Sequence, residues 1–175
     1  MYLFVRVQEP EDYYQAGPSS AHVKARLEAA SGERCLIVPY RECDLAAVEA
    51  LQPRAIVLSG FGGHFQDRDV NAFRGMNEVL HHADAPLLAI CGSHQLLAFA
   101  FEQDLSRVKK LRDTPMRKLR AGEHWPRRAQ DTPAWDLSAY FVAEGFFPIA
   151  RVRTDPLFRG LPRRIILRCS HFCEV

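Results

Sequence analysis

Short apolar runs alternate along the chain with segments in which apolar residues recur at helical spacing. Four of these runs are rich in branched side chains, as strands usually are, and they span residues 2–7, 35–38, 55–58 and 86–90. The run at 55–58 is apolar throughout, which predicts a strand buried on both faces. The alternation of strand and helix predicts an α/β fold with a parallel central sheet covered by helices.

Polar capping residues precede the helical patterns between these runs. We expect Gln8–Pro18 to be a polar loop, with a helix that Ser19 or Ser20 caps and Gly32 ends. Asp44 and Asp69 would cap two further helices. Two more strands are expected near the end of the chain. The apolar faces of the three helices are Val23, Leu27 and Ala30; Leu45, Val48 and Leu51; and Val70, Phe73 and Leu80. The two later strands span residues 146–152 and 164–169.

Composition narrows the class of protein. The 175 residues are 47% hydrophobic, which is enough for a sizeable core, and a net charge of +2 gives no reason to expect a nucleic-acid partner. No stretch approaches the roughly 18 apolar residues of a membrane span. The five cysteines include no C-x-x-C pair, which indicates reduced thiols in a cytoplasmic protein. We therefore expect one domain over residues 1–175, with no metal site, no cofactor and no membrane partner.

A basic segment at residues 105–130 interrupts the regular pattern. Nine of its residues are Lys or Arg, and Pro115, Gly122 and Pro126 prevent a long helix. We interpret the segment as a solvated insertion or flap. The alternative is a patch for a phosphorylated acceptor or an acidic partner, with Trp125 and Trp135 fixing its end or contacting a ligand.

Cys91 stands where the fourth apolar run meets a helical pattern. Small residues follow it, and a strand–turn–helix of this kind presents a side chain at the tip of a buried strand. The N-terminus of the next helix is then directed at the thiol, and its dipole and free N–H groups favour a thiolate. The pattern predicts a nucleophile. The alternative is a buried structural cysteine, since free cysteine is often buried.

The residues around Cys91 resemble the nucleophile motif of the class I glutamine amidotransferases, G-I-C-x-G-H-Q-L-L, which Ile90–Leu97 matches as I-C-G-S-H-Q-L-L. Ile56–Gly60 resembles the strand and glycine turn before the family's oxyanion loop. Asp155–Pro162 resembles a D-P-L-F-x-G-L-P connector, and Ser170–Val175 an S-H-x-x-x-V segment. The resemblance implies a three-layer flavodoxin-like sandwich with a mostly parallel central sheet, which we expect to lack its last strands. It also implies hydrolysis of the glutamine side-chain amide through a Cys91 thioester, with release of ammonia.

The resemblance also implies roles for the backbone around the thiol. The N–H of Gly92 would donate to the oxyanion of the tetrahedral intermediate, and Gly60 and Phe61 would supply the second donor. Gly62 and Gln95 would contact the substrate, since a carboxamide can both donate and accept hydrogen bonds. The family usually has S-G-G-P or S-N-G-P in this loop, where the chain has Ser-Gly-Phe-Gly.

Two residues depart from the family's motif. Ala89 and Ser93 stand where the family has glycine, two residues before and two residues after Cys91. Both are small, so we expect the turn to form with some strain. His94 lies next to this turn, and we interpret it as a structural residue.

The reaction also needs a general base. In the family it is the histidine of an H-P-E motif, which this sequence does not contain. We expect that motif, its strand and its carboxylate to lie in a part of the domain that this sequence lacks. His171 is the remaining candidate within the chain. Cys173, two residues on, would share its strand face, and Glu174 would point away.

Three functions fit these observations. The first is glutamine amidotransferase chemistry, with glutamine as the bound molecule and ammonia passed to a synthetase or another acceptor protein. The second is a γ-glutamyl hydrolase of the same fold, which would accept γ-glutamyl conjugates larger than glutamine. The third is a catalytically inactive relative that binds a ligand or a partner, in which the Cys91 thiol would have ordinary reactivity.

Overall fold

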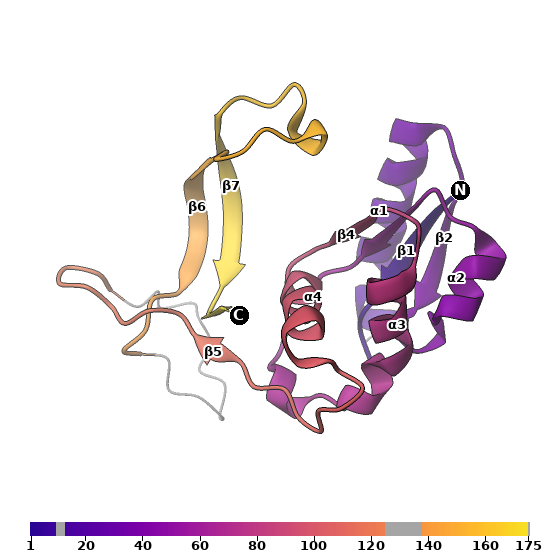
Figure 1. Ribbon diagram of the computed structural model, residues 1–175. Helices are drawn as coiled ribbons and strands as arrows, with labels where there is room; N and C mark the ends of the chain where they lie inside the picture. The colour runs from indigo at the N-terminus through magenta and orange to yellow at the C-terminus, as the bar shows by residue number, and fades with distance from the viewer. Residues whose placement is uncertain (10–12, 125–137, 175) are drawn as a thin grey trace. The chain divides into compact units, whose positions relative to one another are not determined.

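The computed structural model describes residues 1–9, 13–124 and 138–174, and Figure 1 shows the arrangement of its elements. The chain divides into two compact units, Met1–Arg112 and Asp113–Glu174. The boundary between the units falls inside the basic segment predicted at 105–130. The single domain over residues 1–175 stays a prediction.

A four-stranded parallel sheet forms the centre of the first unit. Its strands are β1 (Tyr2–Arg6), β2 (Cys35–Pro39), β3 (Ala55–Leu58) and β4 (Leu87–Ala89), and their order is β2-β1-β3-β4. All three pairings are parallel. This is the strand order of flavodoxin-like sheets, so the predicted α/β class and parallel sheet are confirmed.

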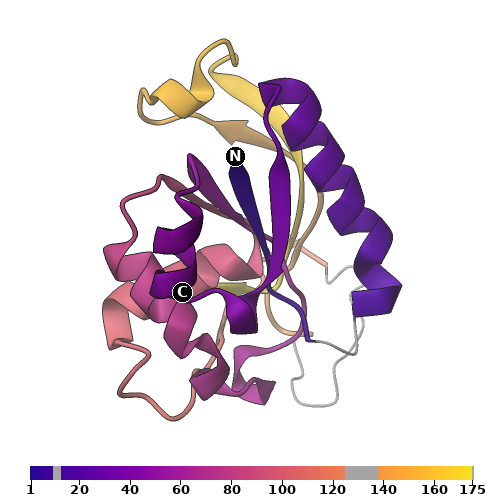
Figure 2. The same cartoon turned by 90° about the vertical axis from the view of Figure 1, so that its right-hand side faces the viewer.

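Helices cover both faces of this sheet. Figure 2 shows α1 (Tyr13–Ser31) along one face, with α2 (Leu45–Leu51), α3 (Arg74–His82) and α4 (Gly92–Gln103) on the other. Alternation along the strands explains the two layers, because successive side chains point to opposite faces. The core under α1 contains Phe4, Val57, Val23 and Leu27, and the larger core contains Leu3, Val5, Ile56, Leu58, Met76, Val79 and Leu96.

The first helix starts earlier than its sequence predicts. Gln8–Pro18 was expected to be a loop, but α1 begins at Tyr13 and continues through Gly17 and Pro18, so Ser19 and Ser20 lie inside the helix and do not cap it. A proline inside a helix costs about 3 kcal/mol. Packing of Val23 and Leu27 on the sheet holds the helix in place and outweighs this local preference. Gly32 ends the helix as predicted, with φ +70° and its N–H bonded to the Glu28 carbonyl.

The other predicted caps occur with one change. The Asp44 carboxylate accepts a hydrogen bond from the Ala47 N–H at 2.8 Å and caps α2. Asp69 accepts from the Asn71 N–H at 3.0 Å, but it caps a 3-10 helix, η4 (Val70–Phe73), that runs into α3. The helix predicted to follow Asp69 directly is therefore α-helical only from Arg74.

The second unit is built on a hairpin. Strands β6 (Ala143–Ala150) and β7 (Arg164–His171) pair antiparallel, and the two strands expected in this region are therefore present. The connection contains η5 (Pro156–Phe158), which Asp155 caps by accepting the Leu157 N–H at 2.8 Å. Strands β5 (Thr114–Pro115) and β8 (Cys173–Glu174) form a second antiparallel pair.

The basic segment is divided between the two units. Leu105 and Leu111 are buried in the core of the first unit, so this end of the segment is packed. In the second unit the Arg117 guanidinium makes two hydrogen bonds to the Glu123 carboxylate and lies 4.3 Å from the Phe141 ring centroid. Trp125, Trp135, Arg127 and Arg128 lie outside the described residues.

Within the described ranges, every helix is too short or too polar to cross a bilayer.

Candidate functional site

Cys91 occupies a strained turn between β4 and α4. Its backbone has φ 54° and ψ −120°, a conformation that costs a non-glycine residue about 1–3 kcal/mol. Hydrogen bonds on both sides of Cys91 hold it there. The Ile90 N–H donates to the Leu58 carbonyl at 3.2 Å, and the His94 N–H donates to the Cys91 carbonyl at 2.8 Å. The predicted strand–turn–helix is therefore formed, with an exposed thiol at its tip.

Two glycines let the loop after β3 approach this turn closely. A Cβ atom added to Gly92 would lie 2.8 Å from the Phe61 carbonyl oxygen and 2.9 Å from two ring carbons of Phe61. A Cβ added to Gly60 would lie 3.0 Å from the Cβ of Cys91. Side chains do not fit at such distances, so glycine at both positions is what brings the loop against the thiol.

Ser93, at one of the positions where the family has glycine, stabilises the turn from its buried side. Its side chain is fully buried, and its hydroxyl donates a hydrogen bond to the Ser59 carbonyl at 2.5 Å. The Ser59 hydroxyl in turn accepts the Val7 N–H at 2.8 Å. The departure at Ser93 therefore adds a hydrogen bond between the start of α4 and the end of β3.

The loop presents a carbonyl oxygen to the thiol. The Phe61 oxygen lies 4.0 Å from the Cys91 Sγ. A trans peptide carries its oxygen and its N–H on opposite sides, so the N–H of Gly62 points away from the Sγ. The backbone N–H groups of Gly60, Phe61 and Gly92 remain the candidate donors to an oxyanion.

The other residues predicted around the thiol lie on the first turn of α4 and in the glycine loop. His94 is exposed, and Gln95 is half-buried with its N–H 3.3 Å from the Cys91 carbonyl. Gly62 is exposed, and its carbonyl accepts a hydrogen bond from Arg68. The structure thus places Gln95 and Gly62 on the two elements that meet at Cys91, while their contact with substrate stays a prediction.

His171 belongs to the second unit. It is the last residue of β7, is exposed, and pairs in register with Ala143. The neighbouring Ser170 donates a hydrogen bond to Glu144 at 2.7 Å. Because Cys91 and His171 lie in separate units, the role of His171 as base stays a prediction.

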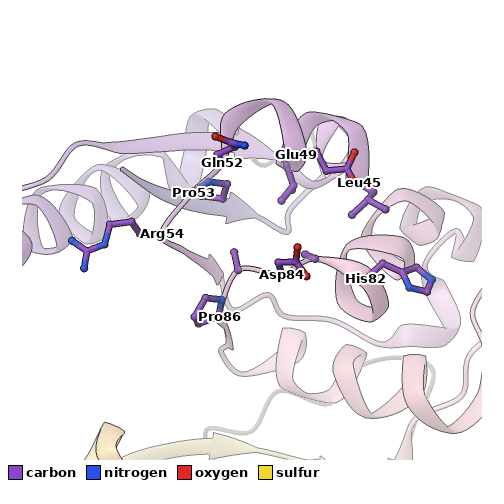
Figure 3. Close-up of a pocket in the computed structure, with 11 residues that line it drawn as sticks. Leu45, Glu49, Gln52, Pro53, Arg54, His82, Asp84 and Pro86 are labelled. Atoms are coloured by element: carbon purple, nitrogen blue, oxygen red, sulfur yellow. The ribbon is translucent and has the colours of Figure 1, made fainter.

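A hollow of the first unit lies at the amino ends of β3 and β4 (Figure 3). It has a volume of about 420 Å³. Its lining includes Pro53 and Arg54, which precede β3, and Ala85 and Pro86, which precede β4. Ligands of parallel α/β sheets bind at the carboxyl ends of the strands, where Ser59, Gly60 and Cys91 lie, so we do not assign this hollow to the site.

Comparison with known proteins decides the family. The model of the glutamine amidotransferase class-I family matches residues 15–175. The chain belongs to the class I glutamine amidotransferases. No match was found among curated proteins.

A solved structure agrees with this assignment at the level of the fold. It is a crystal structure from Thermoplasma acidophilum, described as a candidate subunit of a GMP synthase, with a TM-score of 0.58 and 16% sequence identity. The match covers 99% of this chain and 66% of that chain. The chain therefore spans slightly less than two thirds of the length of this structural neighbour.

Sequence reasoning missed Arg68, which contacts the glycine loop at two points. Its guanidinium carbon lies 4.4 Å from the centroid of the Phe61 ring, and its Nη2 donates to the Gly62 carbonyl at 2.7 Å. No motif marks an arginine at this position, and only the folded arrangement brings it to the loop.

Proposed function

We propose that this chain carries the glutamine-hydrolysing half of an amidotransferase reaction, with Cys91 as the nucleophile. The observation that supports this most strongly is the turn itself. An exposed cysteine sits in a strained strand–turn–helix, with Gly60 packed closely against Cys91 and Gly92 packed closely against Phe61. Strain of this kind persists where function requires the conformation.

The chemistry follows from the atoms around the thiol. The Cys91 thiolate attacks the side-chain carbonyl carbon of glutamine, and an S–C bond forms while the carbonyl oxygen becomes an oxyanion. Backbone N–H groups of Gly92 and of Gly60 or Phe61 stabilise that charge. The C–N bond then breaks, and the nitrogen leaves as ammonia after taking up a proton. Water hydrolyses the γ-glutamyl thioester to glutamate and restores the thiol.

His171 is the proton donor that we propose within this chain. Acyl transfer to a thiol needs a group that protonates the leaving nitrogen, and histidine is the usual choice. Glutamine itself would be held by Gln95 and by the backbone at Gly62.

We further propose that the ammonia is used by a partner synthetase in the cytoplasm. The structural neighbour described as belonging to a GMP synthase supports a partner of this class. The five cysteines carry thiols and form no disulfide with one another, which fits a reducing compartment.

Release of ammonia and glutamate from L-glutamine tests the proposed function. We expect Cys91→Ser to lower the rate at least about a thousandfold, because removing a catalytic nucleophile has effects of that order. The His94→Asn variant is the matched control, since the side chain of His94 is exposed and we assign it no part in the chemistry. Faster release of glutamate from larger γ-glutamyl conjugates than from glutamine would favour the hydrolase alternative. Equal rates for wild type and Cys91→Ser would contradict the proposal.

A further inference from the structure

The loop Gly60–Gly63 has little stiffness of its own. Three of its four residues are glycine, and it contains no proline. Glycine loses more backbone freedom on ordering than any other residue. Oxyanion donors are effective only if they are fixed before the charge develops, so contacts from outside the loop must hold it.

The side chain of Phe61 makes such contacts on several sides. It is 7% exposed, and its ring packs against the Gly92 backbone, on the element that carries Cys91. Phe65 meets the same ring edge-on, with the two centroids 5.2 Å apart. Phe61 therefore connects the loop after β3 to the turn after β4.

Arg68 holds both the side chain and the backbone of this loop. Its guanidinium lies over the Phe61 ring at 4.4 Å and donates to the Gly62 carbonyl at 2.7 Å. The side chain is 13% exposed. Stacking of a planar guanidinium on an aromatic ring is a favourable contact that lysine reproduces poorly.

Glu9, three residues after β1, forms an ion pair with Arg68. Its Oε1 lies 3.5 Å from the Arg68 Nη1, an ion pair without hydrogen-bond geometry. The carboxylate also accepts hydrogen bonds from the Tyr40 hydroxyl at 2.8 Å and from Arg41 at 2.7 Å. Burial raises the pKa of Glu9, but the hydrogen bonds from Arg41 and Tyr40 outweigh it and bring the pKa below its usual 4.5. Glu9 is therefore charged at neutral pH, and buried Tyr40 connects it to the core.

We propose that Arg68 is a positioning residue that holds the Gly60–Gly63 loop against the Cys91 turn through the Phe61 ring and the Gly62 carbonyl. Arg68 touches neither Cys91 nor, on this account, the substrate. It acts by keeping the backbone donors of Gly60 and Phe61 in place. The consequence for catalysis rests on the proposed function, whereas the ordering of the loop does not.

Two measurements on the whole chain test this proposal in Arg68→Met, which keeps an unbranched apolar stem and removes the guanidinium. The first is amide hydrogen exchange in the peptide that contains Gly60–Gly63, with the peptide of α2 as internal reference. We expect exchange in the loop to become about tenfold faster and exchange in α2 to stay unchanged.

The second measurement compares two reagents at Cys91. Iodoacetamide reports the exposure of the thiol, whereas the diazoketone analogue of L-glutamine also requires its carbonyl to be bound. In Arg68→Met we expect the rate with the diazoketone to fall about tenfold, as for a weakened oxyanion site. The rate with iodoacetamide should stay within about twofold of wild type. Arg68→Lys should resemble Arg68→Met, because lysine lacks the planar stack.

Arg41→Met is the matched control. Like Arg68, Arg41 pairs with Glu9, but the contacts to the Gly60–Gly63 loop described above come from Arg68. Arg41→Met should behave as wild type in both measurements. Unchanged exchange at Gly60–Gly63 in Arg68→Met would overturn the proposal, as would an equal fall with both reagents. If wild type does not react with the diazoketone while exchange in the variant rises, the positioning role stands and the proposed function fails.

Discussion

At the residue scale, the close packing around Cys91 requires glycine, which has no side chain, at positions 60 and 92. The Cβ that Gly92 lacks would occupy the space of the Phe61 carbonyl and ring. Backbone atoms cannot move aside as the end of a flexible side chain can, so substitution here must push the loop away from Cys91. This contact, more than the thiol alone, distinguishes the turn from a simple buried cysteine.

Gly92→Ala should therefore destabilise the protein by about 1–3 kcal/mol, the usual cost of overpacking. It should also move the loop off the turn. Chemical denaturation measures the first effect. Gly62→Ala is the control for stability, since a Cβ there meets nothing within 4 Å, and its unfolding midpoint should match wild type. A Gly92→Ala midpoint equal to that of Gly62→Ala would show that the packing at Phe61 is looser than described.

The cysteines should differ sharply in reactivity. Cys91 is exposed, whereas Cys43 is buried, and burial, with a smaller effect of Asp44, raises the pKa of Cys43 to about 12. Burial also raises the pKa of Cys35. A thiol with a raised pKa stays protonated, so we expect Cys43 to remain unmodified from pH 7 to pH 9 while Cys91 is alkylated. Peptide mass spectrometry after iodoacetamide treatment measures this, and alkylation of Cys43 as fast as Cys91 would contradict it.

At the element scale, the start of α4 is attached to the end of β3 by a buried hydrogen bond. Ser93→Ala would leave the Ser59 carbonyl without its donor in a dry environment. Such a loss costs about 1–3 kcal/mol. We expect a lower unfolding midpoint, measured by chemical denaturation. Ser106→Ala, which removes an exposed hydroxyl bound to Asp104, should have a much smaller effect, and an equal effect would argue against the role of Ser93.

The elements that surround the site could be predicted from the sequence because they depend on local pattern. The runs at 55–58 and 86–90 contain the strands β3 and β4. Apolar residues throughout are typical of a strand covered on both faces, which fits β3, where Ile56, Val57 and Leu58 are buried, but not β4, where Leu88 is exposed. The turn at Cys91 could be predicted because small residues lie between the apolar run at 86–90 and a helical pattern. The start of α1 could not be predicted, because packing on the sheet overrides the preference of Gly17 and Pro18.

Contacts between residues far apart in the sequence could not be predicted in the same way. Arg68 and Glu9 are 59 positions apart, and their pairing depends on how β1 and the glycine loop are brought together. The same applies to the hydrogen bond between Ser93 and Ser59. A single sequence shows which residues can form such contacts but not which ones do.

At the scale of the whole molecule, the family is established while the proton donor is a proposal. The Cys91 turn and the glycine loop lie in the first unit, and His171 lies in the second. If His171 protonates the leaving nitrogen, His171→Asn should lower glutaminase turnover about a hundredfold or more. Alkylation of Cys91 by iodoacetamide should not change. His124→Asn, on an exposed histidine of the same unit, is the control, and unchanged turnover in His171→Asn would exclude His171 as the base.

The central claim is that Cys91 reacts as a nucleophile with a bound glutamine side chain. The most direct test is the intact mass of the protein after incubation with the diazoketone analogue of L-glutamine, followed by peptide mapping. We predict a single adduct on Cys91 that excess L-glutamine prevents and that Cys91→Ser does not form. The absence of an adduct, or labelling spread over the other cysteines and insensitive to L-glutamine, would contradict the account.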